Sequence, residues 1–433
     1  MMKKTVALFM TVLMVFSLAA CGSGSDGKGD SKKEGDEKGG DSEIVLEFQQ
    51  WFDNEMEEGY LQSICDDFYE ETGIKIKLLS NPYADTKTQL EASAAAGTMA
   101  DIVALDGGWI YDYAKQGLLA KLDGLYEDTG FDAKSVAEGT KVDKALYAQP
   151  IVNFPSMMAV NLDLLKSAGV DTLPETWSEF QEACEKVTDS GDNVYGFCSN
   201  MSTDNATSVE YLTAFAWNSG CSILTDDGKP FIADNEVLAD TCEFLKGLID
   251  AKVTSPGIYT MTDADKVEEF TNGRVAFIAD SVAHMSNIRE QAPDMNFTYM
   301  NMPHKDDYSG DSYVRVNNWA VGIGENCKYK EEAAKFIEYL LSPEVNADLC
   351  IHANAFPANS EAEPQYEDDS DAFKAIYDVY MNSNGVAEYY SMPTAEALMS
   401  AFIDGLVMYF DGDYDDVNNM LSEVQTQFDA AYE

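Results

Sequence analysis

The sequence predicts an α/β fold built as two lobes, and three observations lead to this class. Short apolar runs typical of strands alternate with longer segments whose apolar residues recur at helical spacing. Residues 43–433 are too many for one small core but suit two lobes. Hydrophobic residues make up 45% of the chain, with 23 tyrosines among them, which is enough material for two cores.

The first elements after residue 43 set the pattern of strand followed by helix. Ile44–Phe48 is a β-type run, and the apolar residues of 61–69 then recur at helical spacing until Gly73. Ile74–Leu79 alternates as a second strand, a helix is predicted over 86–96, and Ile102–Leu105 is a third strand. This alternation favours an α/β lobe with a largely parallel sheet. Ligands bind such sheets beyond the carboxyl ends of the strands, where loops begin at Gln50 and Asp106.

The rest of the chain continues the alternation and then becomes mostly helical. The middle contains predicted strands over 157–160 and 275–279 and predicted helices over 162–168, 176–187, 208–218, 235–251 and 263–272. Beyond residue 330 the predicted helices cover 330–341, 343–349, 371–381, 394–410 and 415–432.

The first 42 residues predict export and attachment to a membrane. Lys3 and Lys4 precede an apolar segment, Val6–Leu18, that is short for a membrane span and typical of a secretory signal. Small residues then lead into Cys21, an arrangement that resembles the bacterial lipobox, in which the cysteine is lipidated. The alternative is an ordinary secretory signal with a chance cysteine. Gly22–Ser42 contains only Gly, Ser, Asp, Glu and Lys and is expected to be a flexible tether.

The strongly acidic composition excludes some partners. The formal net charge of −49 argues against nucleic acid, because a polyanion would be repelled. It also opposes a role in which a whole face lies on anionic lipid. The acids either keep an exposed protein soluble or select a cationic ligand, and composition alone does not separate these two explanations.

The cysteines predict mostly free thiols. Setting Cys21 aside leaves an odd number: Cys65, Cys184, Cys198, Cys221, Cys242, Cys327 and Cys350. Complete internal pairing is therefore impossible, and the intervals are wide and irregular. A disulfide between Cys198 and Cys221 remains open.

Four segments together carry a family resemblance. They occur in the order Asp101–Leu122 (beginning DIVALDGGW), Tyr147–Trp177 (beginning YAQP), Phe270–Ile278 (FTNGRVAFI) and Asn318–Glu344 (beginning NWAVGI). In this order and behind a lipobox, they resemble the extracellular solute-binding protein family that includes the maltose-binding proteins. The resemblance spans residues 44–360.

The resemblance implies a class II type periplasmic-binding-protein-like fold, with a hinge and a cleft between the lobes. The chain would divide into a signal peptide (1–20), the tether (21–42), one lobe from 43–150 plus 304–345, and another from 151–303 plus 346–433. Pro150–Asn153 and Met302–Pro303 resemble the two crossings between the lobes. Closing such a hinge on a solute signals occupancy to a membrane permease.

A sugar needs hydrogen bonds to its hydroxyl groups and flat rings against its C–H faces, which polar and aromatic side chains supply. The residues expected to bind the ligand are Trp51, Asp53, Asp106, Trp109, Asn153, Phe154, Trp217, Asp280, Asn318, Trp319 and Tyr390. For several of them a structural role is the alternative. Trp51 and Trp217 equally suit a core, and Asp106 suits the N-cap of a helix that begins near Trp109.

One position departs from the family. An aromatic residue commonly follows the strand at 275–279 by a few positions, but this chain reads Asp280-Ser-Val-Ala-His284. The missing ring argues against a long glucan, and His284 offers a partial replacement.

An enzyme is the main rival class, and the sequence argues against it. The chain has no HExxH metal motif, no GxSxG nucleophile elbow and no GxxxxGK[ST] phosphate loop. Among 77 acidic residues, no pair is marked out by local context as a glycosidase pair. A nearer rival keeps the fold and binds a polyamine or another small cationic solute.

We therefore expect a monomer, anchored through Cys21 on the outer face of a Gram-positive cell membrane. It would capture a carbohydrate, without a cofactor or a metal, and deliver it to the permease of an ABC importer.

Overall fold

The computed structural model describes residues 43–203, 205–368 and 370–432. The predicted signal peptide, the tether and Cys21 lie outside these residues. Among the helices that are described, none is long and apolar enough to cross a membrane.

One large sheet organises the described chain. Its central path runs β2-β1-β3-β9-β5-β7-β6, with four short strands at its sides. The strands are β1 (Ile44–Gln50), β2 (Ile74–Ser80), β3 (Ile102–Leu105), β4 (Thr140–Val142), β5 (Ala145–Asn161), β6 (Tyr195–Cys198), β7 (Val275–Ser281), β8 (Phe297–Met300), β9 (Tyr313–Ile323), β10 (Phe356–Pro357) and β11 (Asn384–Val386).

The sheet as a whole is mixed, although its first three strands have the parallel order that was predicted for this lobe. Strands β1, β2 and β3 are parallel as predicted, and β6 is parallel to β7. However, β9 is antiparallel to both β3 and β5, and β5 is antiparallel to β7. The local periodicity of the first strands could not show that a segment more than 200 residues later inserts between them and the rest of the sheet.

Most helices agree closely with the predicted ranges, whereas α4 and α10 were not predicted. They are α1 (Tyr60–Thr72), α2 (Tyr83–Ala96), α3 (Gly107–Lys115), α4 (Leu122–Thr129), α5 (Leu162–Ser167), α6 (Trp177–Asp189), α7 (Ser208–Trp217), α8 (Glu236–Asp250), α9 (Asp263–Thr271), α10 (Met285–Gln291), α11 (Lys330–Leu340), α12 (Pro343–His352), α13 (Asp371–Met381), α14 (Ala395–Asp411) and α15 (Val417–Ala431), with short 3-10 turns η1 (Phe52–Asn54), η2 (Ala133–Ser135), η3 (Val282–His284) and η4 (Glu388–Ser391). Local chemistry explains several ends. A capping box between Thr176 and Glu179 starts α6, and Gly73, with a φ of 72°, ends α1.

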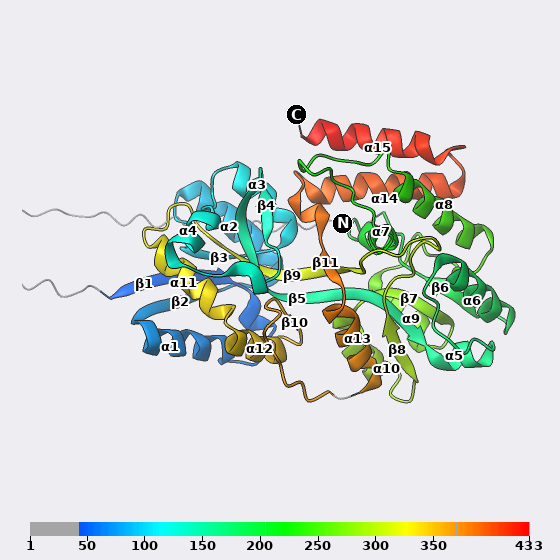
Figure 1. The fold of residues 1–433 in the computed structure, drawn as a ribbon, viewed down its shortest axis with the longest axis horizontal. Helices are drawn as coiled ribbons and strands as arrows, with labels where there is room; N and C mark the ends of the chain where they lie inside the picture. The colour runs from blue at the N-terminus through cyan, green and yellow to red at the C-terminus, as the bar shows by residue number, and fades with distance from the viewer. Residues whose placement is uncertain (1–42, 204, 369, 433) are drawn as a thin grey trace, which may run out of the picture. The chain divides into compact units, whose positions relative to one another are not determined.

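Two long strands join the two halves of the molecule. Figure 1 shows β5 and β9 running side by side from the group that contains β1, β2 and β3 to the group that contains β6 and β7. The strand predicted at 157–160 is only the last part of β5, which spans 17 residues. Pro150 and Pro155 hide this continuity in the sequence, because proline is usual at strand edges and irregularities.

The buried apolar side chains form two cores. One core draws on β1, β2 and β3, the start of β5, the end of β9 and the segment from α11 to Ala358. The other draws on the end of β5, on β6 and β7, on helices from α5 to α10, and on α14 and α15. Strands β5 and β9 contribute to both cores, so they position any site between the two.

Candidate ligand-binding site

The joining strands present two different faces. In their antiparallel register, Phe154 lies opposite Asn317 and Ser156 lies opposite Arg315, while Asn153 lies opposite Asn318. Successive side chains of a strand point to opposite faces. One face therefore carries Phe154 and Ser156 of β5 together with Arg315, Asn317 and Trp319 of β9. We call this the arginine face, and the face with Asn153 and Asn318 the asparagine face.

An aromatic cluster lies beside the arginine face. Phe52 stacks on Trp319 with ring centroids 4.5 Å apart, and Phe154 meets the same indole edge to face at 5.4 Å. The cluster continues through Trp51, whose ring lies 5.9 Å from that of Trp109. Trp51 is only 3% exposed, so it packs as a core residue as well as bordering the site.

Tyr83, which the sequence analysis missed, adds an exposed ring to this cluster. It stacks against Trp109 at 5.9 Å and remains 47% exposed. Its hydroxyl donates a hydrogen bond of 3.1 Å to Asp106 Oδ2. Tyr83 lies just beyond the end of β2, and this position could have identified it. The loops after β1 and β3 were predicted to bind the ligand, and the loop after β2 lies at the same edge of the sheet.

Two carboxylates lie on the loops that follow β1 and β3. Asp106 is the N-cap of α3 and accepts a 3.1 Å hydrogen bond from the Gly108 backbone N–H. Burial raises the pKa of Asp106, although the bonds from Gly108 and Tyr83 favour its ionised form. Asp53 accepts a hydrogen bond from the Ser80 hydroxyl through Oδ2, and its Oδ1 is buried without a partner.

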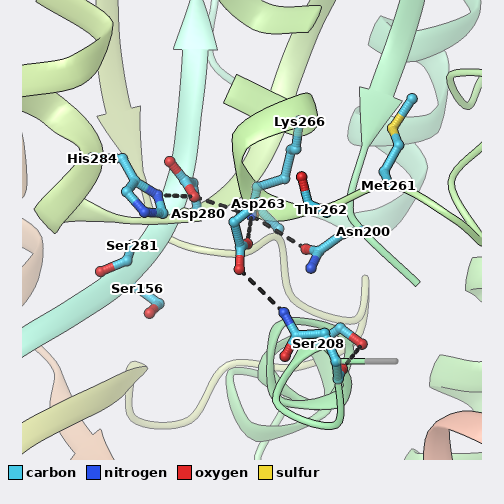
Figure 2. Close-up of polar contacts among 12 residues, drawn as sticks. Ser156, Asn200, Ser208, Met261, Thr262, Asp263, Lys266, Asp280, Ser281 and His284 are labelled. Carbon is cyan, nitrogen blue, oxygen red and sulfur yellow. Dashed lines mark hydrogen bonds and ion pairs between the residues drawn. The ribbon is translucent and has the colours of Figure 1, made fainter. Parts of the chain in front are cut away.

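In the half of the molecule that contains β6 and β7, a buried lysine organises a charge network (Figure 2). The Lys266 ammonium is fully buried and lies 3.0 Å from both Asp263 Oδ1 and Asp280 Oδ1. It also donates a 2.7 Å hydrogen bond to the Ala279 carbonyl oxygen. His284 Nδ1 lies 2.8 Å from the same Asp280 oxygen.

This geometry decides the charge states of the network. Burial alone would raise the pKa of Asp280, but Lys266 and His284 outweigh it and the pKa is lowered. Burial opposes the charge of Lys266, yet Asp280, Tyr211 and Asp263 raise the pKa of the ammonium above its ordinary value. The hydrogen bond to Asp280 raises the pKa of His284. Lys266 and Asp280 therefore form an ion pair at neutral pH.

A second ion pair lies on the arginine face itself. Arg315 Nη2 donates to Glu210 Oε2 at 2.5 Å and Nη1 donates to the Ser156 hydroxyl at 2.6 Å, with all three side chains buried. The ring of Tyr211 joins the two pairs, since Lys266 Nζ lies 4.2 Å and Arg315 Cζ lies 5.2 Å from its centroid.

Several buried polar atoms of this region have no partner within the protein. They are Asp53 Oδ1, Ser199 Oγ, Asn200 Nδ2, Glu210 Oε1, Asp280 Oδ2, Arg315 Nε and Asn318 Oδ1. A buried polar atom without a hydrogen bond costs about 1–3 kcal/mol, so each of these atoms can gain stability from a partner that arrives from outside the protein. The set contains both acceptors and donors, as a polyhydroxyl solute requires.

Tyr390 connects the two halves of the molecule. Its hydroxyl donates to Asn317 Oδ1, which also accepts a 2.9 Å hydrogen bond from Arg315. Its ring covers Gly107 at the start of α3, so closely that a Cβ on Gly107 would overlap the ring.

Trp217 is buried on α7 and belongs to the carboxyl-terminal core. Its indole N–H donates a 2.6 Å hydrogen bond to Glu388, which also accepts 2.9 Å from the Ile223 N–H and a bond from the Ser222 hydroxyl. Burial raises the pKa of Glu388 against these three donors. Trp217 and Glu388 thus fix η4, and with it Tyr390.

The asparagine face lines a cavity of about 830 Å³. Asn153, Asn318 and Tyr390 are the predicted site residues that line it, together with 134–141, 383–387 and Tyr380. Asn153 Nδ2 donates a 2.7 Å hydrogen bond to the Tyr380 hydroxyl.

The structure therefore divides the predicted site residues into groups. One group lies on or beside the aromatic cluster, and its members are Trp51, Asp53, Asp106, Trp109, Phe154 and Trp319. Asp280 belongs to the charge network. Tyr390 binds Asn317 of the arginine face and also lines the cavity at the asparagine face. Sequence reasoning missed Lys266 and Arg315. The sequence offered one indication of them, since both are basic residues in a strongly acidic chain. Lys266 lies on α9, and Arg315 lies on β9 two positions before Asn317.

No metal-binding or disulfide chemistry is found in the described part of the chain. No group of three or more His, Cys, Asp or Glu side chains there is arranged to hold a metal ion. All seven described cysteines are free, so Cys198 and Cys221 are not joined.

Comparison with known proteins identifies the family to which this chain belongs. The model of a bacterial extracellular solute-binding protein family matches residues 63–375. The chain belongs to this extracellular solute-binding family. Its members are binding proteins rather than enzymes, and some relatives are named lipoproteins.

Individual members show the same relationship. A protein of Brucella abortus that is named as a binding protein is 26% identical over 322 residues, which are 74% of each chain. The diacetylchitobiose binding protein of Streptomyces coelicolor is 23% identical over 84% of this chain and 83% of its own. The crystal structure of a cyclic alpha-maltosyl-1,6-maltose binding protein from Arthrobacter globiformis superposes with a TM-score of 0.75 at 18% identity, over 90% of this chain and 99% of that one. This last likeness confirms the predicted α/β fold with two lobes.

Proposed function

We propose that this protein captures a carbohydrate outside the cell and delivers it to the permease of an ABC importer. The observation that carries the proposal is that aromatic rings cluster in one half of the molecule while partnerless buried donors and acceptors gather mainly in the other, with the joining strands between them. Sugars present hydroxyl groups and apolar ring faces together, and this combination satisfies both. Relatives named for binding diacetylchitobiose, galactooligosaccharide and maltooligosaccharide support the same class of ligand.

Capture works by closing one lobe on the other, without covalent chemistry or a cofactor. We place one lobe on the core of β1, β2 and β3 and the other on the core of β6 and β7. The first core contains residues as far as Ala358, so we extend its carboxyl-terminal part from 345 to about that residue. Bending of β5 and β9 would bring the aromatic cluster and the charge network onto the two sides of one sugar.

The protein would act as a monomer held at the membrane by a lipid on Cys21. The relatives named as lipoproteins support this anchor, and the long polar tether supports a Gram-positive cell wall. A polyamine is the second candidate ligand, because Glu210 and Asp280 each keep one carboxylate oxygen without a partner.

The proposal is tested by thermal unfolding of the purified protein in the presence of oligosaccharides, monosaccharides, polyamines and divalent metals. A ligand at 100 times its Kd adds about 2.7 kcal/mol of stability, which shifts the Tm visibly. A shift with one glycan class would support carbohydrate capture. A shift only with polyamines would overturn the carbohydrate class while keeping the transport role.

Site variants then connect binding to the described residues. Asp106→Ala and Trp109→Ala should each weaken binding of the active glycan by about tenfold or more, because a charged hydrogen bond contributes about 1.5–3 kcal/mol and a ring adds stacking. Asp106→Asn keeps an N-cap acceptor and serves as the matched control for folding. Unchanged affinity in both alanine variants would place the site elsewhere, with the asparagine-face cavity as the next region to test.

A further inference from the structure

Tyr390 is held by its own lobe and pressed against the other one. The two preceding residues anchor η4 to the carboxyl-terminal core. Glu388 binds Trp217 and the Ile223 N–H, and the Tyr389 hydroxyl lies 3.0 Å from Thr213 Oγ1. The chain before η4 is fixed as well, since β11 pairs with β9 from Tyr313 to Arg315. Tyr390 is thus presented on a rigid base.

In the other lobe, the Tyr390 ring contacts the backbone of Gly107 rather than a flexible side chain. Gly107 begins α3 directly after Asp106, and its Cα carries no side chain where the Tyr390 ring lies. The ring is only 8% exposed. Neither a sugar ring nor a water layer fits between Tyr390 and Gly107 in this arrangement.

Further contacts between neighbouring elements of the two lobes extend this barrier outward. The Thr394 N–H lies 3.5 Å from Asp112 Oδ1, and Lys87 Nζ lies 3.7 Å from Glu396 Oε2. The rings of Tyr111 and Tyr432 are 6.2 Å apart. Figure 1 places α3 beside the chain that leads into α14, in agreement with these distances. The two lobes therefore meet in a wall along α3, and Tyr390 is its innermost member.

This wall borders the proposed site directly. The Tyr390 hydroxyl binds Asn317, which binds Arg315, and Arg315 pairs with Glu210, whose Oε1 has no partner. A ligand that reaches Glu210 and Arg315 therefore ends at Tyr390 on the α3 side.

We infer that Tyr390 determines the length of the ligand by closing the α3 end of the binding site, so that a short saccharide is accepted and a longer chain is excluded. The inference rests on the proposed function, because it concerns the carbohydrate that this site would bind. The ring, rather than the hydroxyl, forms the barrier.

The test measures affinity along homologous series by isothermal titration calorimetry. The probes are α-glucans, chitin fragments and β-galactans, each from the disaccharide to the hexasaccharide. In the wild type, the hexasaccharide of the active series should bind about tenfold or more weakly than the best short member. Tyr390→Ala should remove most of this difference. Tyr390→Phe, which keeps the ring, should preserve it.

A second pair of variants tests the contact itself. Gly107→Ala places a methyl group where the ring lies, so it should weaken binding of all lengths, and the double variant Gly107→Ala/Tyr390→Ala should recover the short ligand. Tyr390→Leu replaces Tyr390→Ala if the latter does not give a folded protein by circular dichroism.

The outcomes separate the inference from the function. Equal affinity for short and long members in the wild type, or the same length preference in wild type and Tyr390→Ala, overturns the inference and leaves carbohydrate capture standing. No binding of any series by any variant overturns carbohydrate capture, and the inference falls with it.

Discussion

At the scale of single residues, the charge network shows how a buried lysine is tolerated. Lys266 is fully buried, yet Asp263, Asp280, a backbone carbonyl and the ring of Tyr211 surround its ammonium. Removing one charge of a buried pair typically costs about 3–5 kcal/mol, because the other charge is left unpaired. The network therefore holds the end of β7 in one position, with Asp280 Oδ2 left free.

His284 gives this network a pH dependence of defined sign. Its pKa is raised in the folded protein by the bond to Asp280. The stability that its proton adds is fully present below the unfolded pKa of about 6.5 and is lost as the pH rises through the folded value. We expect the free energy of unfolding to fall across this window by more in the wild type than in His284→Gln, as measured by urea unfolding from acidic to alkaline pH. Parallel profiles for the two proteins would contradict the assignment.

The residues of this site differ in how visible they were in the sequence. Asp106 follows β3 directly and Asp280 lies at the end of β7, so their strand-end positions identified them. Lys266 and Arg315 did not stand out, because a buried cation is recognisable only once its carboxylate partners are placed in space. Arg315 meets Glu210 from more than 100 residues away, and no local pattern encodes that distance.

At the scale of elements, helix positions followed closely from apolar periodicity and capping residues. The predicted and observed ranges of α13 are identical, and those of α7 and α9 differ by one residue. The pairing of strands was less accessible. The insertion of β9 between β3 and β5 depends on contacts across the whole chain, and β9 itself contains the polar residues of the site.

One packing contact between elements makes a clear prediction. A Cβ on Gly196 of β6 would overlap the backbone and Cβ of Cys184 on α6. Gly196→Ala should therefore destabilise the protein by about 1–3 kcal/mol, because the helix must move away from the strand. Chemical unfolding measures the change.

The matched control lies in a helix with free space. Gly247, inside α8, has no heavy atom within 4 Å of a Cβ position. Gly247→Ala should raise stability by about 0.5–1 kcal/mol, since alanine loses less backbone entropy in a helix. The same sign for both substitutions would show that the β6–α6 contact is looser than described.

At the scale of the whole molecule, charge is the dominant property. The formal net charge of −49 is spread over a chain with 28 basic residues, and many of the ion pairs in the described part of the chain are exposed on both sides. Such exposed pairs contribute little to stability, so the repulsion among the remaining carboxylates is not offset.

Salt should therefore stabilise this protein. Raising NaCl from about 0.01 M to about 1 M shortens the screening length from about 30 Å to about 3 Å and weakens the repulsion. We expect the Tm to rise with NaCl in differential scanning calorimetry, and to rise equally with KCl. A Tm that falls with both salts would mean that attractive pairs outweigh the repulsion.

The free cysteines have a practical consequence for studying how the two lobes unfold. Cys65, Cys327 and Cys350 are buried in one core, and Cys184, Cys198 and Cys242 are buried in the other. Burial raises the pKa of each of these thiols, and that of Cys65, Cys198 and Cys327 to about 12, so an alkylating reagent meets almost no thiolate in the native state. Each core thus contains three buried thiols that react with the reagent only when that core unfolds. Mass spectrometry of a timed alkylation, read at these six sites, would resolve a chain modified at three of them from one modified at all six, and so distinguish lobes that unfold one at a time from lobes that unfold together.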